Sequence, residues 1–339
     1  MCNGFPLFSF HSRHGMRILV TGGSGFIGSH LTEKLLAEGH HVVVVDDLST
    51  GSRDNLSRVA THPRLEILLA DLGDAAVVRR ACQGIQAVYH LAAAVGVALI
   101  AKQPTQTIHR NIFPTQLLLD ELRQQHLAGN SIPLFLASTS EVYGKNPKSV
   151  WSEGDDLVFG ATTKPRWSYG ASKAIDEFLA LACVREHGMK VVIGRFFNVV
   201  GPRQSGAYGM VLPRFVSAAM AGSPLIVHDD GKQERCFAHV LDVIRAVTTL
   251  MRTESAFGRI YNVGSDQPIS IYQLAQRVVE IVNPNASLEF QSYAEAYDHD
   301  FEDVRRRVPD LTRIRDTIGY RPEYSLDDTI RHVWRDKLG

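Results

Sequence analysis

Two short stretches carry side chains that could remove a proton from an alcohol. Tyr169 and Lys173 are four residues apart, so on a helix they lie on one face, one turn apart. An ammonium near a phenol stabilises the phenolate, so this spacing predicts a lowered pKa for Tyr169 and a role as general base. The hydroxyls of Ser138, Thr139 and Ser140 follow an apolar run, and we expect one of them to bind the same substrate oxygen. A Tyr-Lys pair also occurs on ordinary helix surfaces, so the surrounding elements must decide.

A hydride acceptor is predicted near the start of the chain. The apolar run 17–21 is typical of a buried parallel strand, and glycines follow it at a spacing of three. Such glycines allow a tight turn that brings a pyrophosphate to the N-terminus of the next helix. A second apolar run, 42–45, ends in Asp46, which would accept hydrogen bonds from a ribose 2′-hydroxyl and so favours NAD over NADP. The predicted contacts around the turn are Gly22, Gly25, Phe26, Ile27 and Gly28.

Strands and helices continue to alternate through the first half of the chain. This alternation predicts an α/β fold of the Rossmann type, a doubly wound parallel sheet that binds ligands at the carboxyl ends of its strands. We expect a long helix over 104–126, in which Asn111 either holds the backbone near the catalytic strand or is a buried capping residue. His90 is interpreted as a packed residue at a strand end. The predicted strand-end positions are Gly22, Asp46, Asp71 with Leu72 beside the adenine, Ala92 and Ser138.

Composition narrows the class of protein. Lys plus Arg and Asp plus Glu each number 36 in 339 residues, and this balance argues against non-specific binding of nucleic acid or of anionic membranes. The four cysteines have no CxxC spacing, which predicts a reduced, cytoplasmic protein with no disulfide framework and no metal site. No apolar run approaches the ~20 residues of a membrane span. Residues 1–15 make a poor signal peptide and are interpreted as a disordered extension.

From Met16 onward, these motifs resemble those of the extended short-chain dehydrogenase/reductase family of nucleotide-sugar enzymes. The resemblance implies that Thr139, Tyr169 and Lys173 form the catalytic set. It also implies a tightly bound NAD, a UDP-sugar substrate and a homodimer formed through two helices of the nucleotide domain. In such enzymes the C4 carbon of the sugar is oxidised, the 4-keto intermediate reacts, and the hydride is returned.

The subfamily is indicated by the residues after Thr139. The 4,6-dehydratases of the family carry Asp-Glu there, whereas this chain has Ser140 and Glu141, so it lacks the acid that protonates the leaving C6 hydroxyl. The 4-epimerases usually have a small or hydroxyl residue where Glu141 stands. The runs 138–144, 164–169 and 301–309 resemble UDP-glucuronate decarboxylases, which include UDP-xylose synthases.

The alternation loosens after residue 195. We therefore expect a Rossmann domain over 16–195 and a smaller, mainly nucleotide-sugar-binding domain over 196–339. The resemblance places Asn198 on the sugar or phosphate, Arg235 on the diphosphate and Arg307 on the uronate or diphosphate. It also places Tyr208 near the base. Arginine suits these anions because its fork binds them bidentately, and a solvated salt-bridge network is the alternative for Arg307 and its neighbours.

Three hypotheses follow. The first is an NAD-dependent UDP-glucuronate decarboxylase, in which Tyr169 takes the C4 hydroxyl proton and carbon dioxide leaves from the 4-keto sugar. Thr139, Tyr169 and Ser140 would stabilise the enolate, and Glu141 or a water that it orients would reprotonate C5. The second is a UDP-sugar 4-epimerase that shares the first step. The third is an NAD-binding regulator without activity, which the intact catalytic set argues against.

Overall fold

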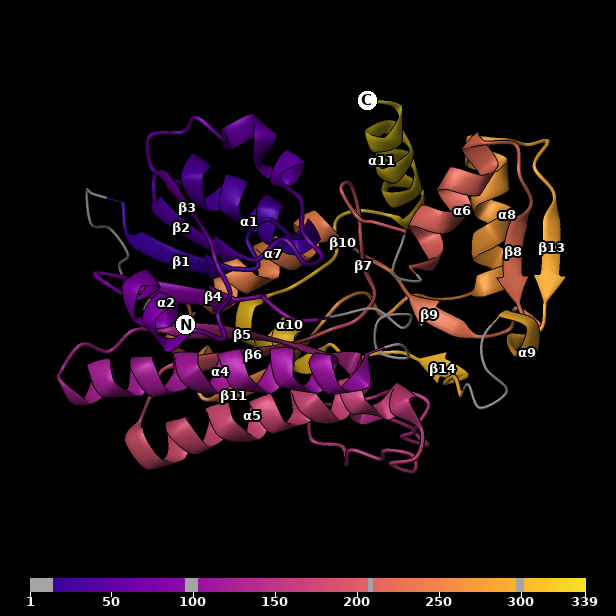
Figure 1. Cartoon of the computed structure of the whole chain (residues 1–339). Coiled ribbons are helices and arrows are strands. Elements are labelled where there is room, and N and C mark those ends of the chain that lie inside the picture. Colours follow the sequence, from indigo (N-terminus) through magenta and orange to yellow (C-terminus); the bar gives the residue numbers. More distant parts are fainter. Residues whose placement is uncertain (1–14, 95–102, 207–209, 297–301) are drawn as a thin grey trace, which may run out of the picture.

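The apolar run after Met16 forms an interior strand of a seven-stranded parallel sheet, between β2 and β4. The computed structural model describes residues 15–94, 103–206, 210–296 and 302–339 (Figure 1). The strand order is β11-β6-β5-β4-β1-β2-β3. Successive strands are added on one side of β1 up to β3 and then on its other side from β4 onward, as in dinucleotide-binding sheets. The strands are β1 (Arg17–Thr21), β2 (His41–Asp46), β3 (Leu65–Leu69), β4 (Ala87–His90), β5 (Leu134–Thr139), β6 (Val191–Phe196) and β11 (Arg259–Val263).

The residues of β1 and β2 alternate between two hydrophobic cores, because successive side chains of a strand point to opposite faces of the sheet. Ile18 and Val20 pack in the core beneath α1, α7 and α10, whereas Leu19 packs with α2, α4 and α5. Both faces of the sheet are therefore covered by helices (Figure 1). The helices are α1 (Phe26–Ala37), α2 (Ala75–Ala81), α4 (Pro104–Leu127), α5 (Ser168–His187), α7 (Val240–Leu250) and α10 (Thr312–Ile318).

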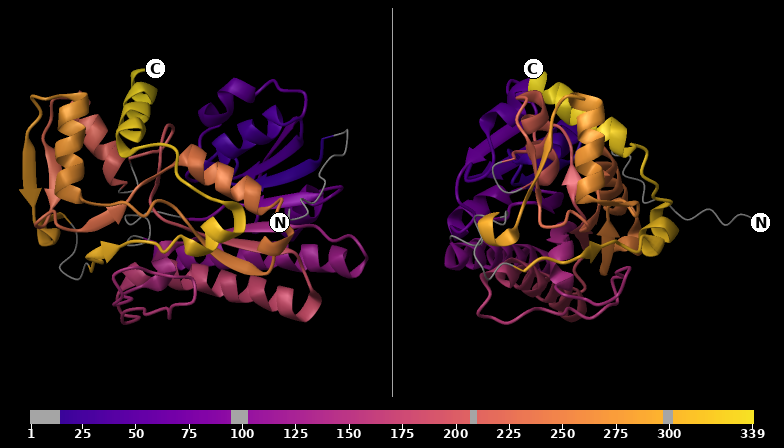
Figure 2. Two further views of the ribbon diagram at one scale, coloured as in Figure 1. Left: turned by 180° about the vertical axis from the view of Figure 1, so that it is seen from behind. Right: turned by 90° about the vertical axis from the view of Figure 1, so that its right-hand side faces the viewer.

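A smaller group of elements stands to one side of this sheet (Figures 1 and 2). Its own core is formed mainly by three helices and a two-stranded parallel sheet of β8 and β13. These elements are α6 (Val211–Met220), α8 (Ile271–Val282), α11 (Leu326–Leu338), β8 (Leu225–His228) and β13 (Leu288–Gln291).

Short strands and turns connect the two groups. A three-stranded sheet has the order β12-β9-β14, and β10 pairs with β7. The strands are β7 (Val199–Val200), β9 (Glu234–Cys236), β10 (Ala238–His239), β12 (Pro268–Ser270) and β14 (Arg306–Arg307). The short helices are η1 (Arg53–Val59), η2 (Ser140–Tyr143), η3 (Pro165–Trp167), η4 (Glu254–Ala256) and α9 (Tyr293–Ala296).

The predicted Rossmann-type fold is confirmed, and the helix expected over 104–126 is α4. One strand from the second half, β11, returns to the large sheet and pairs with β6. The division of the chain at residue 195 stays a prediction. The interpretation of residues 1–15 falls almost wholly outside the described residues.

Candidate active site

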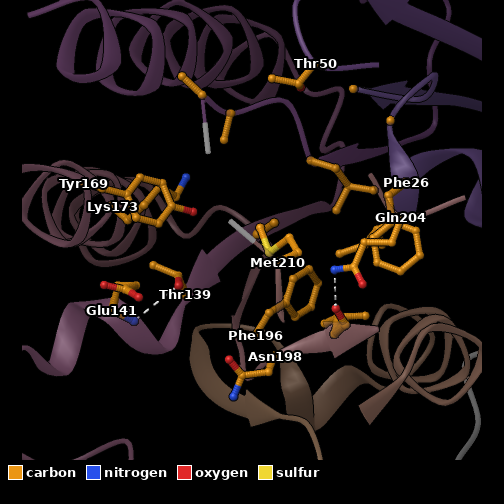
Figure 3. Close-up of a pocket in the computed structure, with 18 of the residues that line it drawn as sticks. Phe26, Thr50, Thr139, Glu141, Tyr169, Lys173, Phe196, Asn198, Gln204 and Met210 are labelled. Carbon is orange, nitrogen blue, oxygen red and sulfur yellow. Dashed lines mark hydrogen bonds between the residues drawn. The ribbon is translucent and has the colours of Figure 1, made fainter. Parts of the chain in front are cut away.

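A pocket of about 500 Å³ lies along the carboxyl ends of β1, β2, β4 and β5 and extends to β8 and β9. Figure 3 shows Thr139, Glu141, Tyr169 and Lys173 together in this pocket. The large sheet positions the lining residues that come from the first half of the chain, because its parallel strands end at a common edge. The lining includes every predicted site residue that the structure describes: Gly22, Gly25, Phe26, Ile27, Gly28, Asp46, Asp71, Leu72, Ala92, Thr139, Ser140, Glu141, Tyr169, Lys173, Asn198, Arg235 and Arg307.

The glycine turn is shaped for a bound pyrophosphate. Gly22 has φ +69°, and a Cβ there would lie 2.8 Å from the backbone nitrogen of Ala92, so a side chain is excluded on both grounds. Gly25 caps α1 without a side-chain hydrogen bond, and the first turn of α1 contains no acidic residue. The N-terminal N–H groups of α1 therefore face the pocket without a competing protein anion, which fits a dinucleotide phosphate.

Asp46 is held in place by the backbone. Its carboxylate accepts hydrogen bonds from the N–H groups of Ser24 at 2.9 Å and Leu48 at 2.8 Å. Burial raises the pKa of Asp46, and these two hydrogen bonds oppose that effect. Because each carboxylate oxygen can accept more than one hydrogen bond, Asp46 retains acceptor capacity toward a ribose hydroxyl.

Two further features lie at the cofactor end of the pocket: Asp71, which was predicted from the sequence, and an ion pair that was not. Asp71 accepts a hydrogen bond from the N–H of Gly73 at 2.7 Å, so its own turn orients it. Arg110 of α4 forms an ion pair with Asp47 at 3.5 Å, and both residues line the pocket. The sequence did not predict this pair, because the residues around Arg110 do not indicate which strand end its side chain contacts.

The pKa expected for Tyr169 is wrong for this structure. Burial and the negative charge of Glu141 raise the pKa of the phenol, although a hydrogen bond with Thr139 lowers it. The ammonium of Lys173 lies 2.7 Å from Asp176 Oδ2, and both side chains are nearly fully buried. Asp176 neutralises the cation that the helical spacing placed beside Tyr169, so Lys173 does not lower the phenol pKa as predicted.

Glu141 is bound by two arginines. Arg166 donates from Nη1 and Nη2 to the Glu141 carboxylate at 2.5 and 3.1 Å, and Arg307 donates from Nη1 to Oε1 at 2.7 Å. Burial alone would raise the pKa of Glu141, but the charges of Arg307 and Arg166 and their hydrogen bonds hold it well below its usual range. Glu141 thus has no proton to donate at neutral pH, and only the water-mediated route to C5 remains from our two expectations.

Arg166 was missed as a site residue. Arg166 belongs to the run 164–169, which resembles the decarboxylases, but the sequence does not indicate which residue it contacts. In the structure, η3 places it directly before α5, and its guanidinium lies 5.6 Å from the centre of the Trp167 ring. The Trp167 indole donates to Glu302 at 3.0 Å, so this ring is itself fixed.

The end of the pocket near β8 and β9 contains a hydrogen-bonded network. Arg235 Nη2 donates to both oxygens of Asp303 at 2.8 and 2.9 Å, and Tyr293 Oη donates to Asp303 at 3.0 Å. Gln233 Nε2 donates to Tyr293 Oη at 2.7 Å. Asn198, with φ +28°, donates to the carbonyl of Cys236 at 3.1 Å. The prediction for Tyr208 lies outside the described residues.

Two expectations about polar residues near the sheet can now be resolved. Asn111 accepts from the N–H of Ala94 at 2.8 Å and donates to Ser172 Oγ at 3.1 Å, so it holds the backbone after β4 against α5. His90 is buried, with its Nδ1 2.7 Å from Thr21 Oγ1 and its Nε2 3.1 Å from Thr115 Oγ1. Burial lowers its pKa to about 3. His90 is thus the packed strand-end residue that we predicted, and its lowered pKa keeps it neutral.

Across the described ranges, no cluster of three or more His, Cys, Asp or Glu side chains has the arrangement of a metal site. Among the helices that the structure describes, none combines the length and apolar character needed to cross a membrane.

Comparisons with known proteins agree with this geometry. Residues 19–333 match the family described as GDP-mannose 4,6 dehydratase. The chain belongs to this family. It is therefore a member of the extended short-chain dehydrogenase/reductase enzymes of nucleotide-sugar metabolism, as the sequence motifs predicted.

The names of individual relatives indicate which reactions similar proteins catalyse. The chain is 36% identical to a UDP-N-acetyl-alpha-D-glucosaminuronate decarboxylase of Bacillus cytotoxicus, over 94% of this chain and 96% of the relative. It is 32% identical to UDP-glucuronic acid decarboxylase 5 of Arabidopsis thaliana, over 92% and 86%. Its structure resembles that of UDP-glucose 4-epimerase from Thermus thermophilus in complex with NAD, with a TM-score of 0.78, 29% identity and coverage of 96% and 99%.

Proposed function

We propose that this protein is an NAD-dependent UDP-glucuronate decarboxylase that forms UDP-xylose. The observation that carries the proposal is the pair of buried arginines, Arg166 and Arg307, around Glu141 beside Tyr169. A cationic cluster next to a base suits a sugar that carries a carboxylate one carbon away from the reacting hydroxyl. The names of the two decarboxylases among the relatives support the same activity.

The first step uses residues of β5 and α5. Tyr169 Oη would take the C4 hydroxyl proton, and Thr139 Oγ1 would donate to the same substrate oxygen. Burial and the charge of Glu141 raise the pKa of Tyr169, so the positive charge of bound NAD would be needed to favour the phenolate. Bound NAD would supply the hydride acceptor and would later return the hydride to C4, so the reaction has no net oxidation. Gly22, Asp46 and the N-terminus of α1 would hold this cofactor.

Decarboxylation follows from the position of the ketone. The C4 carbonyl lies beta to the carboxylate, so the bond from C5 to the carboxyl carbon can break with its electron pair entering an enolate. Ser140 and Thr139 would donate hydrogen bonds to the developing oxyanion. A water oriented by Glu141 would then give a proton to C5.

The rest of the substrate would lie toward the second half of the chain. We propose that residues 196–339 mainly bind the nucleotide sugar, with Arg235 on the diphosphate and Asn198 on the sugar or phosphate. Arg235 is already paired with Asp303, so the diphosphate would share or replace that carboxylate. Arg307 would contact the uronate carboxylate.

Two other substrates or outcomes have specific support. The Bacillus relative is named for a 2-acetamido uronate, so UDP-N-acetylglucosaminuronate is a second candidate substrate for the same reaction. The similarity to a 4-epimerase favours a route in which the 4-keto sugar turns over and takes the hydride on its other face. Glu141, held by two arginines, weighs against an epimerase of UDP-glucose, because a neutral sugar offers these cations no partner. A 4-epimerase of UDP-glucuronate would use the same cations, so only the product distinguishes it from the decarboxylase.

A proton NMR time course with UDP-glucuronate would decide between these outcomes. A pentose anomeric signal accompanied by release of carbon dioxide is expected. A galacturonate signal with every carbon retained would replace the decarboxylase by a 4-epimerase. A parallel run with UDP-N-acetylglucosaminuronate would reveal the preferred substituent at C2, and inertness toward all UDP-sugars would favour the regulator.

We also propose that the protein forms a homodimer in the cytoplasm. Large apolar side chains are exposed on α4 and α5: Phe178 is 65% exposed, Ile175 45% and Phe113 38%. Exposed aromatic and aliphatic side chains on neighbouring helices are typical of a surface that is covered in an assembly.

The cysteines that the structure describes, Cys82, Cys183 and Cys236, are unpaired, which suits a reducing compartment such as the cytoplasm.

A further inference from the structure

Arg166 and Arg307, which we call the arginine pair, approach one carboxylate from different parts of the chain. Arg166 precedes α5, whereas Arg307 lies in β14. Each arginine side chain is 8% exposed, and that of Glu141 is 15% exposed. The three residues thus form a nearly buried ionic cluster in the wall of the pocket that contains Tyr169.

This cluster has an excess of positive charge. Two guanidinium groups face one carboxylate, so within the described residues its net charge is +1, and the neighbouring Arg235–Asp303 pair is neutral. The Nε atoms of both arginines are buried without a hydrogen-bond partner. An uncompensated buried charge is costly, so the cluster is complete only when a second anion joins it.

We propose that Arg166 determines the specificity for a uronate by neutralising Glu141, which leaves the charge of Arg307 available to the substrate carboxylate. This inference rests on the proposed function and adds a residue and a role to it. Without Arg166, Glu141 would pair with Arg307 alone and the cluster would have no net charge. Arg166 lies three residues before Tyr169, so the surplus charge is placed beside the group that acts at C4, where the C5 carboxylate must lie.

A comparison of two ligands tests this role. UDP-xylose is UDP-glucuronate without the carboxylate, so the ratio of their dissociation constants isolates recognition of that group. In Arg166→Gln, we expect the affinity for UDP-glucuronate to fall at least tenfold while the affinity for UDP-xylose, the NAD content and the melting temperature stay unchanged. An equal loss of both affinities would overturn the proposal, because it would indicate a structural role.

A charge rescue provides a second, independent test. In Glu141→Gln/Arg166→Gln, Arg307 again has no competing carboxylate, so the affinity for UDP-glucuronate should return to within about threefold of the wild-type value. A double variant as weak as Arg166→Gln would overturn the proposal. Glu141→Gln alone should bind UDP-glucuronate at least as tightly as the wild type, which keeps the test open if Arg166→Gln does not fold.

Failure of this inference and failure of the proposed function give different results. If the wild-type enzyme releases carbon dioxide from UDP-glucuronate but Arg166→Gln keeps the wild-type ratio of dissociation constants, only the role of Arg166 is rejected. If the wild-type enzyme releases no carbon dioxide from any UDP-uronate, the decarboxylase itself is rejected.

Discussion

Lys173 Nζ lies 2.7 Å from Asp176 Oδ2 in the interior of the protein, so the cation of the proposed catalytic set is already paired. The Asp176 charge is also one of the causes that raise the pKa of Tyr169. The basicity of the Tyr169 phenol is therefore coupled to a carboxylate two turns further along α5.

Asp176→Asn should shift the acidic limb of the kcat/KM profile to lower pH. Removal of the negative charge leaves Lys173 unpaired and lowers the pKa of Tyr169, so the phenolate that acts as base persists to lower pH. We expect a shift of about one pH unit, given that opposite charges at this range change a pKa by 1–3 units. Glu186→Gln, on the exposed end of α5, is the matched control, and an unmoved or raised limb would contradict the coupling.

Tyr169→Phe should abolish turnover without removing the cofactor. Loss of a general base typically costs about 10²–10⁴-fold in rate, whereas the glycine turn and Asp46 remain intact. The measurements are product formation by NMR and the nucleotide released on denaturation of the purified protein. Tyr272→Phe, a half-exposed residue of α8, should behave as the wild type. Turnover within tenfold of the wild type would remove Tyr169 from the mechanism.

Asp46→Asn should relax the choice between NAD and NADP. The carboxylate repels a 2′-phosphate, and the amide keeps one oxygen that can accept from Ser24 or Leu48. We expect the ratio of NADP to NAD dissociation constants, measured by calorimetry on the stripped protein, to fall about tenfold, which is about 1.4 kcal/mol. Asp120→Asn, at a half-exposed position of α4 outside the pocket lining, is the control. An unchanged ratio would place the discrimination elsewhere.

His239 should make stability depend on pH. Burial, with the charges of His332 and His30, lowers the pKa of His239 to about 4, against about 6.5 in the unfolded chain. The unfolded state therefore binds more protons below pH 6.5, and stability falls as the pH falls. The contribution to the free energy of unfolding between pH 7.5 and pH 5 is about 2 kcal/mol.

His239→Asn is the variant that isolates this effect. Asparagine can replace the cap in which His239 accepts from the N–H of Leu241, but it does not titrate. Urea unfolding at the two pH values should show a pH-dependent loss about 2 kcal/mol smaller than in the wild type. The exposed His109→Gln serves as control. An equal loss in wild type and His239→Asn would mean that other groups cause the pH dependence.

Phe178→Glu should convert the proposed dimer to a monomer. A charge at this exposed apolar position of α5 would have to be buried in the assembly, at a cost of several kcal/mol. Light scattering after size exclusion measures the mass directly. Leu338→Glu, at a position of α11 that is 67% exposed, should leave the mass unchanged. A dimeric Phe178→Glu would locate the interface elsewhere.

The sequence alone determined those features that depend on local chain geometry. The glycine spacing after β1, the acid at the end of β2 and the separation of Tyr169 and Lys173 each act within a single turn or strand. Parallel strands then bring their ends to one edge, so the alternation of strands and helices was enough to predict a shared pocket.

Only the tertiary structure decided how the charges pair. Arg307 meets Glu141 across 166 positions of sequence, and Asp303 meets Arg235 across 68, which no local pattern specifies. The same holds for β11, which returns to the large sheet beside β6. Electrostatic properties such as the pKa of Tyr169 or of Glu141 depend on burial and on these distant partners. Many lining residues could thus be predicted from sequence, whereas the site roles of Arg166, Arg110 and Asp47 and the charge states of the site required the folded chain.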